Sequence, residues 1–414
     1  MKKYLLFLFL IASVFAHAQT VIKGKVIDEK TKETLPGVSI YVNNSTIGTI
    51  TNNDGEFLLS VPFSGKVELV ASYLSYIKQV LIIENNDNNL ITIALKPEPN
   101  TLNEVVIKAT KNKSGNFDKW GALFERLLLG NNSHHFIAKI RNPQVLVFYF
   151  DQDKNELSVF ARSSLIIENS VTNYRLKLEI DNFKYAFNTS ELQTTFSTFF
   201  EEMKVSDSKK IDINNSRQLA YYGSQMHFMR MVKLNDLTRN GYKLYVYKSN
   251  KNAEKERITK LIQQKLNENS STQSAVLYDI AKLFKNRDTA YYYKMIMKQD
   301  DILSADTTFT LIRNFSKFNR VKDVANFYAK DSLMVDYQMF NDRNNKRVKP
   351  EELAKWKAKN SKTKEKGSTT ILYFTSKEGV NVQSTGYYPE TGLFFFGDMF
   401  DRRVAQLLPW DYEP

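Results

Sequence analysis

The sequence contains no cysteine and only four histidines among its 414 residues. Without cysteine the chain cannot form disulfides, iron–sulfur clusters, thiol nucleophiles or cysteine-bound zinc. Four histidines leave little room for a histidine-based metal site. After the first 15 residues no apolar run of about 18 residues occurs, so the sequence predicts no transmembrane helix. A glycine-rich phosphate loop is also absent. We therefore expect no metal, no cofactor and no nucleotide, and we nominate no catalytic residue.

The composition is that of a folded, basic protein. Hydrophobic residues make up 42% of the chain and charged residues 25%, which is typical of globular proteins. The length predicts two or three domains. Lys and Arg outnumber Asp and Glu by 58 to 45, which gives a formal net charge of +13.

Residues 1–18 have the pattern of a signal peptide. Two lysines at positions 2 and 3 precede an apolar stretch at 4–15, and Ala-His-Ala at 16–18 fits a small-x-small cleavage site. We expect an exported chain that begins at Gln19. No cysteine follows, which excludes a lipid anchor on an N-terminal cysteine. Export also takes the chain away from chromosomal DNA, so we expect no nucleic-acid partner.

Residues 19–96 have the pattern of a small all-β domain. Short runs with apolar residues at every second position are separated by polar turns, which is typical of a sandwich. The strongest turn signal is Asn52-Asn53-Asp54-Gly55, because Gly55 can take a positive φ and the Asn and Asp side chains can bond their own backbone. We expect about six strands, at residues 21–27, 38–42, 56–61, 66–73, 78–83 and 90–95.

Three motifs stand out in this region: Gly24–Asp28 (GKVID), Leu35–Ile40 (LPGVSI) and Gly48–Phe57 (GTITNNDGEF). Together they resemble the carboxypeptidase-D-regulatory-like domain, and the resemblance covers about residues 20–97. It implies a transthyretin-like or Ig-like β-sandwich, of a kind common in exported proteins of Gram-negative bacteria. Members often carry a Gly-Tyr pair in the second half of the domain, where this chain has Ser75-Tyr76.

The same domain often precedes TonB-dependent outer-membrane receptors, joined by a segment that Leu102–Ile107 (LNEVVI) resembles. Such a receptor needs a barrel of about 22 strands of about 10 residues each, and the chain after residue 110 is too short for it. The domain also accompanies zinc carboxypeptidases, which need a His-x-x-Glu pair. None of the four histidines begins such a pair. We therefore expect this chain to share the front module and not these activities.

A linker at 97–116, stiffened by Pro97 and Pro99, leads to an α+β domain at 117–414. An apolar helical face begins at Phe117, with Asn116 as N-cap and Gly130 just past the end. Period-two or apolar runs predict strands at residues 145–150, 157–167, 174–187, 194–202, 332–340 and 370–388. Period-3.6 runs predict helices at about residues 256–266 and 276–284.

Motifs after residue 129 resemble the later portion of uncharacterised proteins known by their carboxypeptidase-regulatory-like start. Examples are Ile140–Pro143 (IRNP), Tyr221–Phe228 (YYGSQMHF) and Leu407–Tyr412 (LLPWDY). This resemblance covers about 280 residues. It implies a recurring architecture and brings no activity with it.

The best candidate nucleophile is Ser224, which follows Gly223 and precedes His227. A serine hydrolase requires Gly-x-Ser-x-Gly at a strand–helix elbow and a histidine oriented by a carboxylate. Only part of that pattern is present. We therefore interpret Ser224 as a helix N-cap beside a methionine-rich apolar patch.

Asp151, Asp153 and Asn155 alternate like the start of a calcium loop. An EF-hand then needs a glycine and a glutamate where this chain has Glu156 and Arg162. A solvated hairpin turn is the better interpretation.

Two basic features remain. His134 and His135 follow a helix end, where positive charge complements the helix dipole. Residues 343–366 carry ten Lys or Arg and three Glu, and we interpret them as a solvated helix with a flexible loop. Attraction to an anionic membrane surface is the alternative.

The leading hypothesis is a non-enzymatic exported protein, periplasmic or associated with the outer membrane, that acts as a binding or assembly module. Its partner would be an envelope protein or a glycan. One alternative is a hydrolase that uses carboxylates or Ser224, which needs two carboxyl groups about 5–9.5 Å apart in one cleft. Another is a small outer-membrane β-barrel built after residue 140, although residues 253–284 have a helical pattern.

Overall fold

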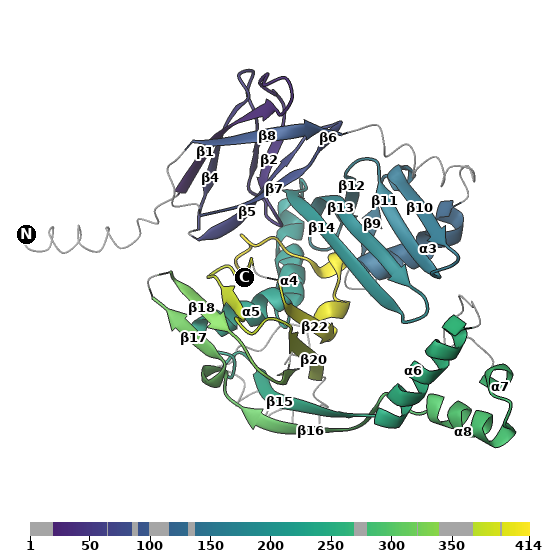
Figure 1. Ribbon diagram of the computed structural model, residues 1–414. Helices are drawn as coiled ribbons and strands as arrows, with labels where there is room; N and C mark the ends of the chain where they lie inside the picture. Colours follow the sequence, from purple (N-terminus) through teal and green to yellow (C-terminus); the bar gives the residue numbers. More distant parts are fainter. Residues whose placement is uncertain are drawn as a thin grey trace, which may run out of the picture.

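Figure 1 shows a computed structural model of the chain. The structure describes residues 20–63, 65–84, 90–98, 116–130, 137–268, 280–320, 322–338, 367–389 and 391–414. The expected signal peptide, the segment Leu102–Ile107, the pair His134 and His135, and the basic residues 343–366 lie outside these ranges. Within them, every helix is too short or too polar to cross a membrane.

Residues 20–98 form a sandwich of two four-stranded sheets, purple to blue in Figure 1. The sheet orders are β4-β1-β8-β6 and β3-β2-β5-β7. Strands β1 and β8 are parallel, and the other neighbours are antiparallel. The strands are β1 (Thr20–Asp28), β2 (Ser39–Val42), β3 (Gly48–Ile50), β4 (Glu56–Val61), β5 (Lys66–Ser72), β6 (Tyr76–Ile77), β7 (Gln79–Glu84) and β8 (Ile91–Pro97).

The sandwich core follows the period of two in the sequence. In β4, Phe57, Leu59 and Val61 are buried, and the residues between them face solvent. The facing sheet contributes Ile40, Leu69 and other apolar side chains to the same core. The predicted fold class, an N-terminal β-sandwich followed by an α+β region, is confirmed.

Two turns of the sandwich have conformations set by residues within the turn itself. Asn52 Oδ1 accepts the N–H groups of Asp54 (3.0 Å) and Glu56 (2.8 Å), and Gly55 has a φ of 71°, as predicted. Ser75 stands where related domains carry glycine, and its φ is 65°. The left-handed conformation costs a non-glycine residue about 1 kcal/mol. The next residue is held in place, because the Tyr76 hydroxyl donates to the Asp28 carboxylate at 2.8 Å.

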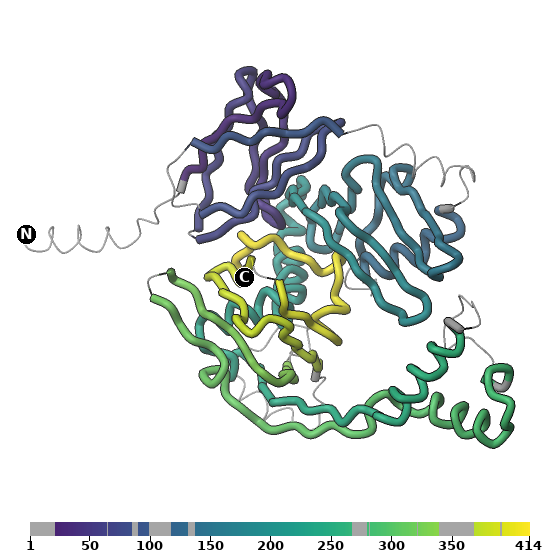
Figure 2. Tube along the Cα trace, in the orientation of Figure 1, coloured from purple at the N-terminus to yellow at the C-terminus, as the bar shows by residue number. Residues whose placement is uncertain are grey.

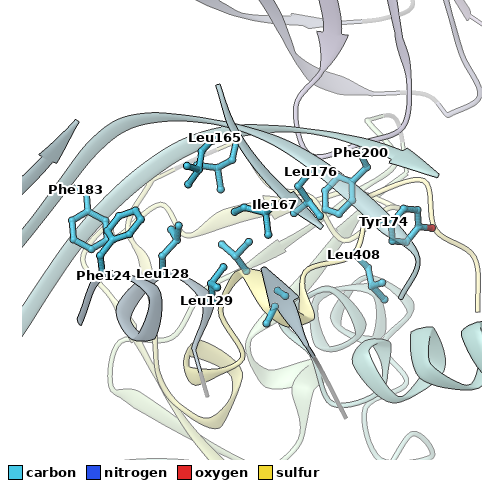
Figure 3. Packing of buried hydrophobic residues seen from close by; sticks show 14 of the residues in the cluster. Phe124, Leu128, Leu129, Leu165, Ile167, Tyr174, Leu176, Phe183, Phe200 and Leu408 are labelled. Carbon is cyan, nitrogen blue, oxygen red and sulfur yellow. The ribbon is translucent and has the colours of Figure 1, made fainter. Parts of the chain in front are cut away.

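The second region packs helix α3 (Asn116–Leu129) against a six-stranded sheet. Strand β13 is the centre of this sheet: β14 pairs along its length, while β11 and β12 pair with its two ends. In Figure 3, Phe124 and Leu128 of α3 face Phe183 and Leu165 of the sheet. The helix ends at Leu129, and Gly130 just past the end has a φ of 83°, as predicted. The strands are β9 (Ala138–Ile140), β10 (Leu146–Asp151), β11 (Glu156–Ala161), β12 (Leu165–Asn169), β13 (Tyr174–Ala186) and β14 (Glu191–Glu202).

The prediction of a single strand at 157–167 was wrong. The chain turns between β11 and β12, and the long strand β13 then offers each of them a separate stretch to pair with. Asn142 holds this turn from a distant position. Its side-chain N–H donates to Ser164 O (3.0 Å), and its Oδ1 accepts the N–H of Ile166 (2.7 Å). Within the run, the polar residues Arg162–Ser164 lie at the turn, and this break signal was overlooked in the prediction.

The third region contains helices α4 (Lys210–Tyr221) and α5 (Gln225–Leu234) and two sheets, ordered β16-β15-β19-β20-β22 and β17-β18-β21. Its core includes Phe228 and Val232 of α5. The predicted strand at 370–388 was wrong, because the chain turns at Gly379 (φ 72°) and passes from one sheet to the other. The strands are β15 (Tyr242–Lys251), β16 (Ile302–Thr310), β17 (Ser316–Asn319), β18 (Val324–Phe327), β19 (Ser332–Gln338), β20 (Gly367–Phe374), β21 (Val380–Val382) and β22 (Leu393–Gly397). Helix α10 (Asp398–Asp401) follows, and short 3-10 turns lie at 143–145, 207–209, 312–314 and 404–406.

Strands β15 and β16 form a long hairpin that carries three helices at its far end, seen at the lower right of Figure 1. We call this hairpin and its helices the arm. The helices are α6 (Ala253–Glu268), α7 (Ile280–Leu283) and α8 (Arg287–Met297). They share a small core of their own that includes Ile258, Ile262 and Leu266. The helix predicted at 256–266 is confirmed, and among the described residues the one expected at 276–284 begins at Ile280.

The sandwich lies directly against the later regions. Backbone hydrogen bonds join Phe200 N–H to Ser45 O (2.9 Å) and Asn44 N–H to Thr198 O (2.7 Å). The sandwich therefore contacts strand β14 through a parallel β-bridge. Lys78 adds an ion pair to Asp181 at 2.6 Å. The linkage therefore includes many specific polar contacts besides the covalent connection.

We call the second and third regions together the body. Residues 407–414, which we call the tail, run between the sandwich and the body, as the yellow end of the trace in Figure 2 shows. Trp410 N–H donates to Asn44 O (2.7 Å), and the Asp411 carboxylate accepts the Thr46 N–H (2.9 Å) and the Thr46 hydroxyl. On the other side, Arg230 donates to Trp410 O at 2.9 Å. The tail thereby joins the sandwich to both later cores.

Candidate functional site

The Gly223-Ser224-His227 motif lies at the start of α5, in the middle of the molecule. Ser224 Oγ accepts the backbone N–H of His227 at 3.1 Å, so its predicted role as N-cap is confirmed. The His227 ring is 1% exposed. Its Nδ1 accepts the Gly223 N–H at 3.2 Å and lies 2.8 Å from the Tyr242 hydroxyl. Four tyrosine rings contact the imidazole: Tyr221, Tyr222, Tyr242 and Tyr337.

This arrangement assigns the motif to the interior of the fold. Beside it, the Arg402 guanidinium donates to Ala220 O at 2.9 Å, and burial lowers the pKa of Arg402. The buried imidazole and the tyrosine rings fill the junction between the two later cores. The cap hydrogen bond accounts for the position of Ser224.

Replacing Ser224 tests the cap directly. In Ser224→Ala the N–H of His227 loses its acceptor, and we expect the free energy of unfolding to fall by about 1 kcal/mol. Ser224→Asp should recover most of this loss, because Asp is an equally good N-cap. Urea unfolding of the three proteins measures both effects. A cost-free alanine, or an aspartate as unstable as the alanine, would contradict the assignment.

The alternating polar residues at 151–155 form the hairpin turn that the sequence predicts. Asp151 Oδ1 accepts the N–H groups of Asp153 and Lys154, both at 3.1 Å, and Asn155 takes a φ of 51° between β10 and β11. The Asp151 side chain is therefore engaged by its own turn. Over the ranges that the structure describes, no group of three or more His, Asp or Glu side chains is placed to hold a metal ion.

A small hollow, open to solvent, lies where the sandwich meets the body. Val42, Phe63 and Val67 line it from the sandwich, and Tyr387 and Trp410 from the later chain. Its central carboxylate, Glu68, accepts hydrogen bonds from Asn43 and from the Tyr387 hydroxyl (2.8 Å). The polar groups of this hollow thus bond one another across the contact between the sandwich and the body, which we call the seam. The hollow is therefore part of that contact.

The outward face of the five-stranded sheet carries several exposed aromatic side chains. Leu244, Leu333 and Leu372 point into the core, so their neighbours in each strand point outward. Strand pairing places one outward residue of each strand opposite the next, in a single row across the sheet. This row is Phe309, Tyr245, Met334, Ile371 and Phe396. With strands about 4.8 Å apart, it is about 19 Å long.

A second outward row lies two residues along the strands. It places Tyr247 opposite Thr307 and Ser332, and Tyr373 opposite Phe394. We call the eight apolar or aromatic members of the two rows the aromatic face: Phe309, Tyr245, Met334, Ile371, Phe396, Tyr247, Tyr373 and Phe394.

The large side chains of the aromatic face are open to solvent at both edges of the sheet. Phe309 is 56% exposed on β16, and Phe394 and Phe396 are 50% and 54% exposed on β22. The rings of Phe309 and Tyr245 meet edge-on at 5.8 Å. Polar residues such as Lys243 and Asp336 follow in the next row. A contiguous exposed apolar patch with a polar rim is typical of an interaction site.

Sequence reasoning missed this surface, although a signal was present. Segments such as Leu393–Phe396 (LFFF) are apolar at every position, which predicts a strand that meets apolar surroundings on both faces. One face of this sheet is the core, and the other is the aromatic face. Which residues share a row depends on the register of five strands, and that is a property of the fold.

Comparison with known proteins identifies the first domain. Residues 22–107 match the model of the CarboxypepD_reg-like domain family. The N-terminal sandwich is therefore a carboxypeptidase-regulatory-like domain, as its motifs predicted, and it makes up the front of a longer chain.

More distant similarities cover parts of the chain. The TonB-dependent receptor P3 of Formosa agariphila is 29% identical over 102 residues, which is 25% of this chain and 10% of the receptor. The chain thus spans about a tenth of that relative. Among solved structures, a candidate carbohydrate-binding protein from Bacteroides uniformis covers 43% of this chain and 78% of its own, at 10% identity and a TM-score of 0.16. A 9R-lipoxygenase from Cyanothece covers 52% and 48%, at 11% identity and a TM-score of 0.14.

Proposed function

We propose that this protein is an exported, non-catalytic binding or assembly protein of the cell envelope, and that the aromatic face engages its partner. The observation that carries the proposal is the aromatic face itself. It exposes three phenylalanines on a rigid sheet whose other side is packed core. Aromatic side chains, phenylalanine included, and methionine are enriched in protein interfaces relative to the rest of the surface.

The place of action in this proposal is the envelope. The signal-peptide pattern at 1–18 supports export, and the regulatory-like domain occurs also in the TonB-dependent receptor that resembles residues of this chain. The sandwich, held by the tail and by β14, would present its own loops at a constant position relative to the aromatic face. Rigid spacing of two surfaces is what an assembly module requires.

The test compares the wild-type chain with Phe394→Ser/Phe396→Ser, which removes two rings from the aromatic face. Immobilised proteins are exposed separately to detergent-solubilised outer-membrane proteins and to purified peptidoglycan sacculi from the source bacterium. We expect a component of one of these two preparations to be retained by the wild type and lost, at least tenfold, by the double variant.

The matched control is Leu74→Ser, which changes an apolar side chain that is 78% exposed on the sandwich. It should retain the same component as the wild type. If the wild type retains nothing above an unrelated protein, or if the double variant retains as much as the control, the proposal is wrong. Fractionation of cells that express the full chain must also find the mature protein in the envelope.

A further inference from the structure

Strand β16 is the outer edge of the five-stranded sheet, and it is exposed over almost its whole length. In the sheet that the described residues form, its neighbour is β15 alone. Eight of its nine residues, Ile302 to Phe309, are exposed on both faces. Figure 1 shows β16 along the lower border of the molecule. An edge strand of this kind presents a row of backbone N–H and C=O groups that can pair with another strand.

Natural proteins usually protect such an edge with lysine, proline, a bulge or a covering segment. Between Ile302 and Thr310 there is no lysine, arginine, proline or glycine, and Asp306 is the one charged residue. The register shift of the hairpin lies at the Lys251–Ile302 end. From Ser304 to Thr310 the ladder with β15 is regular, which leaves seven consecutive residues of undistorted edge.

We propose that β16 of one molecule pairs antiparallel with β16 of a second copy, with Thr307 on the twofold axis. Thr307 is the middle residue of the regular segment Ser304–Thr310, so this register uses the whole segment. Thr307 of one molecule then lies opposite Thr307 of the other, and the bulky Phe309 lies opposite the small Ala305 of the other. Asp306 faces Thr308, and no charge opposes a like charge.

The two neighbouring symmetric registers, centred on Asp306 and on Thr308, are less favourable. Centring the axis on Asp306 would place two carboxylates directly opposite each other, which destabilises a strand pair. It would also carry the pairing into the register shift at Ile302. Centring the axis on Thr308 opposes no like charges but pairs only residues 306–310 of the regular segment. The Thr307 register therefore pairs the most residues without opposing like charges, and this self-complementarity is why a second copy is the occupant.

Pairing of this kind extends the aromatic face. Phe309 and Thr307 are the β16 members of the two outward rows, so two molecules joined at β16 present one ten-stranded sheet with both faces continuous across the axis. The contact is small, because a seven-residue edge buries less than the roughly 800 Å² per partner of a standard stable interface. We therefore expect a reversible dimer that forms at micromolar concentrations. This inference is independent of the envelope partner, since it concerns the chain alone.

The absence of cysteine makes a direct test available. In the full mature chain, Thr307→Cys places two thiols at the axis, where paired residues have Cα atoms about 4.5–5.5 Å apart, within the range that a disulfide spans. Mild oxidation should convert Thr307→Cys to covalent dimer at least tenfold faster than Ser208→Cys, an exposed position ahead of α4. Equal rates for the two variants would overturn the proposal.

Charge substitution at the same position gives a second, independent readout. Thr307→Lys and Thr307→Glu should each sediment as monomers, because each places like charges on the axis. An equimolar mixture of the two should dimerise at least as well as the wild type. Thr369→Lys, on the same sheet face but within an inner strand, is the control and should dimerise normally. A wild type that stays monomeric up to 100 µM or more, or a mixture that does not associate, would also overturn the proposal.

Discussion

Removing the tail, residues 407–414, is expected to destabilise the protein by about 5 kcal/mol or more. Leu408 is 3% exposed and Tyr412 7% exposed, and both belong to the core formed by α3 and the six-stranded sheet. Burial of each such side chain contributes about 1.5–3 kcal/mol. The truncation also takes away the acceptors of the Thr46 and Arg230 hydrogen bonds. The loss is comparable to the total stability of an ordinary domain.

Thermal unfolding followed by circular dichroism measures this loss, and we expect the midpoint to fall by about 10 °C or more. Hydrogen exchange locates it. The Asn44 and Thr46 amides at the seam should exchange much faster after truncation, while amides paired between β1 and β4 inside the sandwich should change little. The matched control removes Glu413 and Pro414 alone, two exposed residues. A full truncation that behaves like this control would show that the tail does not hold the seam.

Gly223→Ala is expected to cost about 2–4 kcal/mol. Gly223 has a φ of 77°, and a Cβ there would lie 2.5 Å from ring carbons of Tyr337 and 2.8 Å from the Arg402 guanidinium. Tyr337 is 2% exposed and fully enclosed, so its ring cannot move aside without disturbing the core. The cost is the sum of the left-handed backbone, about 1 kcal/mol, and overpacking, about 1–3 kcal/mol.

A second glycine separates these two contributions. Gly37 has nearly the same φ, 76°, and nothing lies within 4 Å of the position of its Cβ. Gly37→Ala should therefore cost only the backbone contribution, about 1 kcal/mol. Urea unfolding of both variants gives the difference. If the two alanines are equally destabilising, the close packing around Gly223 is not what requires a glycine there.

Features that depend on a few neighbouring residues were predictable from the sequence. The Asn52 turn, the Ser224 cap and the helix end at Gly130 each rest on side-chain or φ preferences that act within four or five residues. The sandwich strands followed from period two, and the domain from its three motifs. In these cases the local preference and the final fold agree, so the pattern was sufficient.

Features that depend on distant partners were not predictable. The run at 157–167 is interrupted by the polar residues Arg162–Ser164, which mark a turn. The sequence does not show that Asn142 holds this turn or that both halves pair with β13. The run at 370–388 divides because β21 pairs with β18 and not with β19. A strand pattern states that a segment pairs, and it does not state with which segment.

The aromatic face likewise depends on pairing between distant segments of the chain. Tyr245 and Phe396 share one row of the aromatic face although 151 positions separate them, a separation that β19 and β20 bridge step by step. By itself the sequence determined a signal-peptide pattern, a carboxypeptidase-regulatory-like sandwich and the missing thiol chemistry, because these depend on composition and short motifs. The tertiary structure alone decided which aromatic rings share a surface, which strand forms the open edge and how the tail joins the domains, because contacts between remote segments depend on the packing of the whole chain.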